Sequence, residues 1–148
     1  MDIVTRLELL IKEIPSMMDT ISDEDFNKKH AKDKWSKKEI LGHLCDSATN
    51  NHMRFVKIML SEGLISCEAY LQNQWVSIHD YQNNYSKSEL TALWKQLNLQ
   101  IYYTLKGASE NDFNKQCILP NQSIVTLEWL FTDYIEHMVH HMKQIEGK

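Results

Sequence analysis

Apolar residues recur at spacings of three and four along most of this chain, and seldom at a spacing of two. At about 100° per residue, such spacing lines one face of an α-helix, whereas strands need strict alternation. Glycine and proline, which supply most turns between strands, number only four and two. The pattern therefore predicts an all-α protein, and a length of 148 residues is typical of one domain spanning residues 1–148.

Four long helices are expected, at about residues 2–20, 36–61, 86–107 and from 126 to the last apolar positions. Pro15 lies inside the first and predicts a kink or a break there. The second and third open with Ser-x-x-Glu capping boxes at Ser36 and Ser86, in which hydroxyl and carboxylate satisfy orphan backbone N–H groups. Thr126 can cap the fourth helix, and Gly63 can end the second.

The connections between these helices indicate how the helices are arranged. Residues 64–85 are interpreted as irregular or as one short helix, and they form a long connection, unlike a tight turn between antiparallel neighbours. A Ser-x-x-Asp-Phe-Asn-Lys motif occurs at residues 22–28 and again at 109–115, each time before a long helix. Chance similarity between acidic turns is the alternative. Two helix–loop–helix halves joined by a 64–85 crossover predict a four-helix bundle.

Composition and charge exclude some classes of partner. The formal net charge is −4 without a basic block, which argues against nucleic acid, because its binding requires neutralisation of phosphates. No apolar run approaches the roughly 20 residues of a membrane span, and residues 1–6 lack a signal-peptide pattern. Cys45, Cys67 and Cys117 are odd in number and have no metal-site spacing, so we expect reduced thiols in a cytoplasmic protein.

Three histidines cluster in the last predicted helix. His137 and His141 are four residues apart and share one helical face, as two ligands of a divalent metal must. His141 lies within the apolar stripe and His137 at its edge, whereas His140 lies outside it and is expected to face solvent. The alternative is two partly buried histidines that hydrogen-bond to neighbours. A metal site needs a third ligand from another helix.

The second predicted helix offers that third ligand. His43 lies at the margin of its apolar stripe, so that periodicity predicts a half-exposed side chain. A catalytic metal must be reachable from solvent, which such a position allows. Asp46 follows one turn later and could orient a histidine or act as a general base. The alternative for both residues is a surface position.

These segments resemble a known family. Trp35-Ser36-x-x-Glu39-Ile40-x-x-His43-Leu44-x-Asp46 and the late His137-x-x-x-His141-x-x-Gln144-Ile145 look like the DinB-like (damage-inducible) superfamily. Residues 50–55 and 70–76 resemble one branch of it. The resemblance covers nearly the whole chain and implies an up-down-down-up four-helix bundle, which agrees with the long crossover.

The resemblance also implies a function. Residue by residue, it makes His43, His137 and His141 the ligands of a divalent metal, zinc or nickel. It implies a small-molecule substrate, in some relatives a low-molecular-weight thiol, and a homodimer. Relatives include thiol-dependent transferases and isomerases, and others are described as metal-dependent hydrolases.

Several alternatives remain open at this point. A three-histidine site with an open position lowers the pKa of a bound water toward about 7 and deprotonates a thiol, so hydrolysis and thiol transfer are both compatible with it. Asp46 is predicted as the catalytic group, either as a general base or as a hydrogen-bond acceptor. Asp133 is a second acceptor candidate, and Arg54 a candidate for an anionic substrate. The competing hypothesis is a non-catalytic small-molecule-binding or stress-associated bundle with a structural metal or none.

Overall fold

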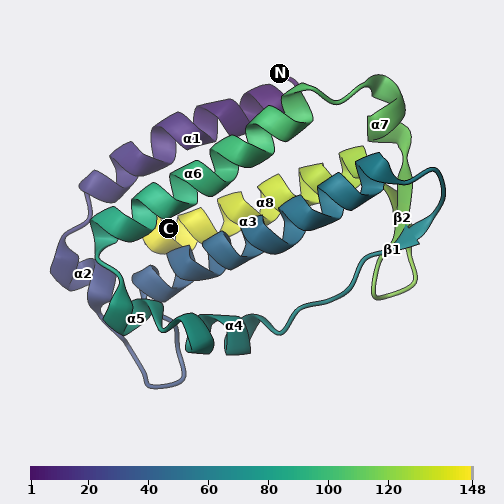
Figure 1. The fold of residues 1–148 in the computed structure, drawn as a ribbon. Helices are drawn as coiled ribbons and strands as arrows, with labels where there is room; N and C mark the ends of the chain where they lie inside the picture. The colour runs from purple at the N-terminus through teal and green to yellow at the C-terminus, as the bar shows by residue number, and fades with distance from the viewer. Residues whose placement is uncertain (148) are drawn as a thin grey trace.

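Four long helices form the protein, for which the computed structural model describes residues 1–147. They are α1 (Ile3–Asp19), α3 (Lys37–Leu60), α6 (Lys87–Lys106) and α8 (Leu127–Glu146). Helices α1 and α8 run in one direction, and α3 and α6 run in the opposite one (Figure 1). The predicted up-down-down-up bundle with a long crossover between its second and third helices is confirmed.

The core lies where the four apolar stripes meet. Helices α3 and α6 pack side by side, α1 packs on α6, and α8 packs on α3 (Figure 1). Phe55 of α3 makes edge-on contacts with Phe131 and Tyr134 of α8, at ring-centroid distances of 5.7 and 5.8 Å. Such aromatic pairs add to the stabilisation from buried apolar area. The stripes predicted from spacing are therefore the buried faces.

The helix termini follow from their capping residues. The Ser36 hydroxyl accepts from the Glu39 backbone N–H at 3.1 Å, and the Glu39 carboxylate accepts from the Ser36 N–H at 3.0 Å. Ser86 caps α6 in the same way. A kink or a break was expected at Pro15, and because α1 continues through it, the break is excluded. Helix α3 ends at Leu60, three residues before Gly63, and Ser61 is its C-cap.

The repeated Ser-x-x-Asp-Phe-Asn-Lys motif forms the same structure twice. It folds into the single-turn helices α2 (Asp23–Asn27) and α7 (Glu110–Asn114), each capped by its serine. Ser22 accepts from the Asp25 N–H, and Ser109 from the Asp112 N–H, both at 3.1 Å. The two halves of the chain therefore share a local design.

A small three-stranded sheet, which the sequence did not predict, lies at one end of the bundle. Its strands β1 (Ile65–Ser66), β2 (Gln116–Ile118) and β3 (Ile124–Thr126) pair in that order, the first pair parallel and the second antiparallel. Strands of two or three residues are too short for alternation to be visible in the sequence. The sheet attaches the start of the crossover to the segment before α8.

The rest of the crossover runs back along α3 (Figure 1). It contains α4 (Gln72–His79) and α5 (Tyr81–Asn84), which meet at Asp80, whose φ of 46° is left-handed. Both short helices pack on α3. One flank of α3 is thereby covered by a segment that comes from outside the four-helix core.

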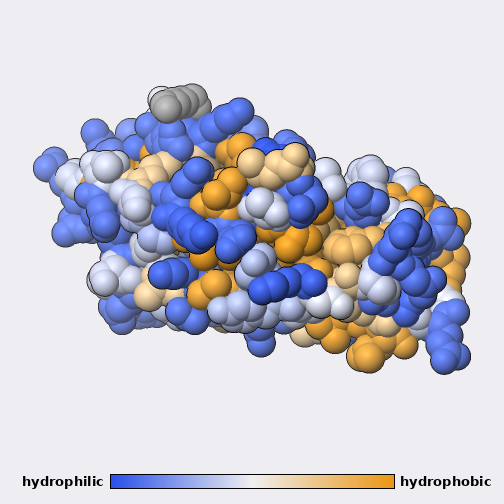
Figure 2. All heavy atoms as spheres, turned by 90° about the horizontal axis from the view of Figure 1, so that it is seen from above, coloured by the Kyte–Doolittle hydropathy of each residue, from blue (hydrophilic) through white to orange (hydrophobic). Residues whose placement is uncertain are grey.

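The surface is mixed in character. Figure 2 shows apolar side chains gathered at the end that carries α7 and the sheet, and polar side chains interspersed with apolar ones elsewhere. Within residues 1–147, the longest helices fall short of the apolar content that crossing a bilayer would demand.

Candidate metal centre

Three imidazoles from two helices meet on one side of the bundle. The Nε2 atom of His137 lies 3.4 Å from Nε2 of His43 and 3.1 Å from Nε2 of His141. One ligand atom from each residue lies within 4.8 Å of the others. His43 comes from α3, and the other two come from successive turns of α8. The fold thus brings together the three histidines singled out in the sequence.

The spacing of these nitrogens matches a metal ion. Two nitrogen ligands placed about 2.0–2.1 Å from a tetrahedral ion lie about 3.3 Å from each other. The observed separations of 3.1 and 3.4 Å are close to that value. Three imidazoles also make up the donor set of many catalytic zinc sites. The residues present fit a divalent ion.

The three imidazoles are held neutral. Burial, together with the nearby His137 and His141, lowers the pKa of His43 to about 3. Burial, with His141 and His140, lowers the pKa of His137 to about 4. The pKa of His141 is lowered by burial, against a hydrogen bond to Gln144 that raises it. Neutral imidazoles offer the lone pairs that a metal requires.

Hydrogen bonding fixes the orientation of one ligand. His141 Nδ1 lies 2.8 Å from the side-chain oxygen of Gln144, which can only accept, so Nδ1 carries the hydrogen. Its Nε2 lone pair is then free to face the other two histidines. Outer hydrogen bonds of this kind orient metal-ligating histidines in proteins. Gln144 therefore prepares His141 for a metal.

His43 is fully buried, and the prediction that it is half exposed is wrong. Trp35, from the loop before α3, packs over its ring at a centroid distance of 4.9 Å, and α8 covers it from another side. The periodicity of one helix does not predict burial of its side chains by other segments of the chain. His137 and His141 are half-buried, so the site reaches the surface through α8, and His140 is exposed as predicted.

Asp46 is also buried, with 2% of its surface exposed. Its Oδ1 accepts from the Tyr81 hydroxyl at 2.5 Å and lies 2.9 Å from His79 Nδ1. Burial raises the pKa of Asp46, while these hydrogen bonds lower it. Its Oδ2, like Nδ1 of His43, is buried without a hydrogen-bond partner in the described part of the chain. The surface position considered for Asp46 is excluded.

No role in this region was predicted from the sequence for Trp35, His79 or Tyr81. Trp35 lies in a loop, and His79 and Tyr81 lie in α4 and α5, which are too short for a period to assign a direction to a side chain. One signal was present: Gly42, a glycine inside a helix, which often marks a close approach. The Tyr81 ring lies so near that a Cβ at position 42 would be 2.1 Å from its Cδ2.

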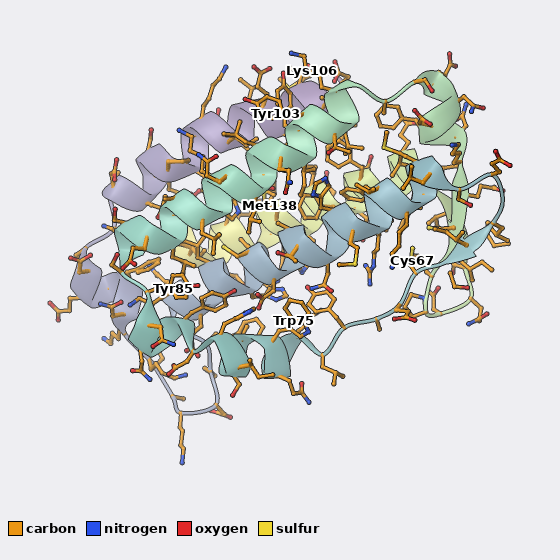
Figure 3. The ribbon with its side chains drawn as sticks, viewed as in Figure 1. Cys67, Trp75, Tyr85, Tyr103, Lys106 and Met138 are labelled. Atoms are coloured by element: carbon orange, nitrogen blue, oxygen red, sulfur yellow. The ribbon has the colours of Figure 1, made fainter. Side chains whose placement is uncertain are left out.

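The other residues considered for the site either lie outside it or form contacts with other groups. Arg54 donates to the backbone oxygen of Glu68 and to Asn51, so that it ties the crossover to α3. Asp133 is exposed on α8. Cys45 is buried, and burial raises the pKa of its thiol. Trp75 lies on the side of α4 that faces α3 (Figure 3).

Comparison with known proteins yields a family match and several similar chains. The family model described as the DinB superfamily matches residues 6–145. The protein named "Putative metal-dependent hydrolase BH0277" of Halalkalibacterium halodurans is 26% identical over 95% of this chain and 84% of its own length. "Putative metal-dependent hydrolase YfiT" of Bacillus subtilis is 23% identical over 92% of this chain and 78% of its own.

Solved structures show the same fold. YfiT from Bacillus subtilis, described as a probable metal-dependent hydrolase with an unusual four-helix bundle topology, superposes with a TM-score of 0.81 at 21% identity over 97% of this chain and 84% of its own. A mycothiol-dependent maleylpyruvate isomerase gives a TM-score of 0.71 at 12% identity, over 95% of this chain and 58% of its own.

Proposed function

This protein belongs to the DinB superfamily, and on that premise we propose that it is a metal-dependent enzyme, a hydrolase or a thiol S-transferase, whose divalent ion is held by His43, His137 and His141. The observation that carries the proposal is that ring nitrogens of three histidines lie within 4.8 Å of one another. The names of the two relatives, of which YfiT also has a solved structure described as a probable metal-dependent hydrolase, support metal-dependent chemistry.

Several residues around the ion have different roles in this proposal. When bound, zinc or nickel supplies Lewis acidity that lowers the pKa of water or of a thiol and so yields a nucleophile at neutral pH. The half-buried His137 and His141 leave an approach for substrate on the α8 side. Trp35 covers the His43 ring and keeps water away from it. Gln144 orients His141.

Asp46, predicted as the catalytic group, serves in this proposal as a hydrogen-bond acceptor, because its burial keeps it from touching a substrate. A histidine that ligates through Nε2 carries its hydrogen on Nδ1 and needs an acceptor for it. Nδ1 of His43 and Oδ2 of Asp46 are both buried and unpartnered, one turn apart on α3. The unpartnered Oδ2 is the acceptor that we propose for the Nδ1 hydrogen of His43.

The proposed substrate is a small molecule, with a low-molecular-weight thiol as co-substrate in the transferase case. The mycothiol-dependent isomerase with the same fold supports this choice of thiol. A homodimer of single-domain chains acting in the cytoplasm completes the proposal.

Metal content tests the site. Purified protein loaded with zinc or nickel and then desalted should hold about one equivalent by elemental analysis, as one three-histidine site requires. His43→Ala should hold none. His30→Ala is the matched control, because His30 is exposed and lies outside the cluster, and it should bind as the wild type does. A wild type without metal would overturn the proposal.

A second experiment separates the two reactions. The loaded protein is offered p-nitrophenyl esters and amides on one hand, and cysteine with 1-chloro-2,4-dinitrobenzene on the other. Turnover of one set that disappears in His137→Ala assigns the reaction class. Metal binding without turnover of either set would favour the non-catalytic bundle.

A further inference from the structure

We infer that His79, carried by the crossover, is the proton-transfer residue of this site, and that Asp46 and Tyr81 are the positioning residues that hold its ring. The inference rests on the proposed function, since it supplies the group that moves protons during hydrolysis or thiol transfer.

Three polar side chains form a closed cluster. Oδ1 of Asp46 lies 2.9 Å from Nδ1 of His79 and accepts from the Tyr81 hydroxyl at 2.5 Å, and that hydroxyl lies 3.0 Å from the same Nδ1. The side chain of His79 is 40% exposed, whereas that of Asp46 is 2% exposed. Of these two groups, only the imidazole can therefore meet a substrate.

The cluster selects one tautomer of His79. An ionised carboxylate only accepts hydrogen bonds, so the nitrogen that faces it carries the hydrogen. Nδ1 is that nitrogen, and Nε2 is left with its lone pair. An imidazole held by a buried carboxylate in this way is the arrangement by which enzymes orient a general base.

The cluster adjoins the His43 position on α3. Asp46 follows His43 by one turn of α3, and residues with this spacing have Cβ atoms about 5–6 Å apart. The Tyr81 ring packs directly on Gly42, the residue before His43, while its hydroxyl reaches Asp46. The crossover thus packs on the flank of α3 that adjoins the ligand position.

The crossover backbone and its aromatic residues hold His79 in place. Helix α4 ends at His79, and the left-handed Asp80 turns the chain so that residues 79 and 81 both reach Asp46. Trp75, one turn earlier on α4, contacts the His79 ring edge-on at a ring-centroid distance of 5.7 Å. Tyr70 in turn contacts Trp75 at 5.8 Å.

Fold stability alone does not account for this cluster. Burial of a carboxylate costs free energy, and an apolar pair of similar volume would pack at least as well. Moreover, one oxygen of Asp46 binds two partners while the other has none in the described part of the chain. Unsatisfied buried polar groups of this kind are often found at functional sites.

The proposed step moves a single proton. Nε2 of His79 accepts the proton of the nucleophile, water or thiol; the O–H or S–H bond breaks and its electron pair stays on oxygen or sulfur. That atom forms the new bond to the substrate, and the bond to the leaving group breaks with its electron pair on the leaving group. The imidazolium then returns the proton to the leaving group.

Nitrogen-15 NMR of the zinc-loaded full chain tests the positioning without any need for turnover. In alkaline solution, where an ordinary imidazole is neutral, His79 should show a protonated Nδ1 and a bare Nε2. Asp46→Ala should abolish this preference, and Tyr81→Phe should keep it because the carboxylate remains. The exposed His30 is the internal reference. A wild-type His79 protonated on Nε2 overturns the inference, even if Asp46→Ala does not fold.

Activity with the two probes tests the proton transfer. His79→Ala should lower kcat/KM about 100-fold or more while zinc content stays at the wild-type level. Imidazole added to the solution should restore part of the rate in His79→Ala only, which a purely structural residue would not permit. His30→Ala should match the wild type.

The outcomes are distinguishable. Activity of His79→Ala within about twofold of the wild type, failure of imidazole rescue, or loss of zinc from His79→Ala would each overturn the role of His79. A wild type that holds zinc and turns over neither probe would instead count against the proposed function. In that case the NMR result alone decides whether the His79–Asp46 pair exists.

Discussion

At the scale of single residues, the protein keeps several polar groups in places where water cannot reach them. His43 and Asp46 are both buried, and each has an atom without a hydrogen-bond partner in the described part of the chain. Such groups cost stability unless a ligand or water satisfies them. These buried groups should therefore lower the stability of the metal-free protein by a measurable amount.

The first prediction concerns pH. His43 has a pKa of about 3 when folded, against 6.5 for an ordinary histidine. Between these values the unfolded chain binds more protons, so the free energy of unfolding rises with pH and is lost on acidification. Between about pH 7 and about pH 5, His43 alone should remove up to about 2 kcal/mol from the metal-free protein. Urea unfolding at each pH measures this loss.

A variant that lacks the His43 imidazole is the control for that experiment. His43→Leu keeps an apolar side chain in the buried position, and its stability should fall less steeply over the same pH interval. Identical slopes for the two proteins would show that His43 is not held neutral by burial.

The second prediction concerns Gly42. Its missing side chain makes room for the Tyr81 ring, whose Cδ2 would lie 2.1 Å from a new Cβ, and the ring is held in place by the bond to Asp46. Gly42→Ala should therefore cost about 1–3 kcal/mol of strain, which outweighs the gain of about 1 kcal/mol in helix propensity.

Gly63→Ala is the matched control, because nothing lies within 4 Å of a Cβ placed there. Chemical denaturation of both variants should show a loss of stability for position 42 alone. Equal stability of Gly42→Ala and wild type would mean that the crossover shifts freely away from α3.

At the scale of elements, the crossover is held on α3 by a few specific bonds. The side chain of Gln82 in α5 donates to the Asn27 backbone oxygen at 2.6 Å and accepts from the Ser36 hydroxyl at 2.5 Å. Lys38 reaches the Gln82 backbone oxygen at 3.3 Å. One glutamine thus links α5 to the segment that leads into α3.

The third prediction follows from these contacts. Gln82→Ala removes two side-chain hydrogen bonds, each worth about 1 kcal/mol, and should lower the free energy of local opening of α4 and α5. Amide hydrogen exchange in residues 72–84 should become about tenfold faster or more. Gln96→Ala, an exposed position on α6, is the control and should leave exchange in the crossover unchanged. Faster exchange spread over the whole chain would indicate global destabilisation instead.

At the scale of the whole molecule, the candidate site joins the two halves of the bundle. His43 and His137 are 94 positions apart, on α3 and α8. The unfolded chain cannot present such a preformed site, so metal binding should add directly to the free energy of folding.

The fourth prediction is a metal-dependent thermal shift. Zinc at about 100 times its dissociation constant should stabilise the fold by about 2.7 kcal/mol, a rise in Tm of about 5–10 °C for a chain of this size. Scanning calorimetry with and without zinc measures it. His30→Ala should show the full rise and His43→Ala none. An equal rise in His43→Ala would place the zinc elsewhere.

Much of the fold could be predicted because its signals are local. The caps at Ser36, Ser86 and Thr126 and the spacing of apolar residues determine the helices within a few turns of chain. The His137–His141 pair is also a local feature, fixed by one turn of helix. His43 was a candidate from its place at the margin of the second helix's apolar stripe, and the family resemblance implied the same residue. The role of these residues as ligands stays a prediction that metal analysis tests.

Contacts between distant segments of the chain cannot be predicted from local sequence patterns. The sequence by itself determined which helices form and which faces are apolar, since both depend on neighbours within a turn. The burial of His43 under Trp35, the bond between His79 and Asp46, and the small sheet depend on segments far apart in the chain. Their arrangement follows from packing of the whole molecule, which is why only the folded protein shows how the crossover and α8 surround α3.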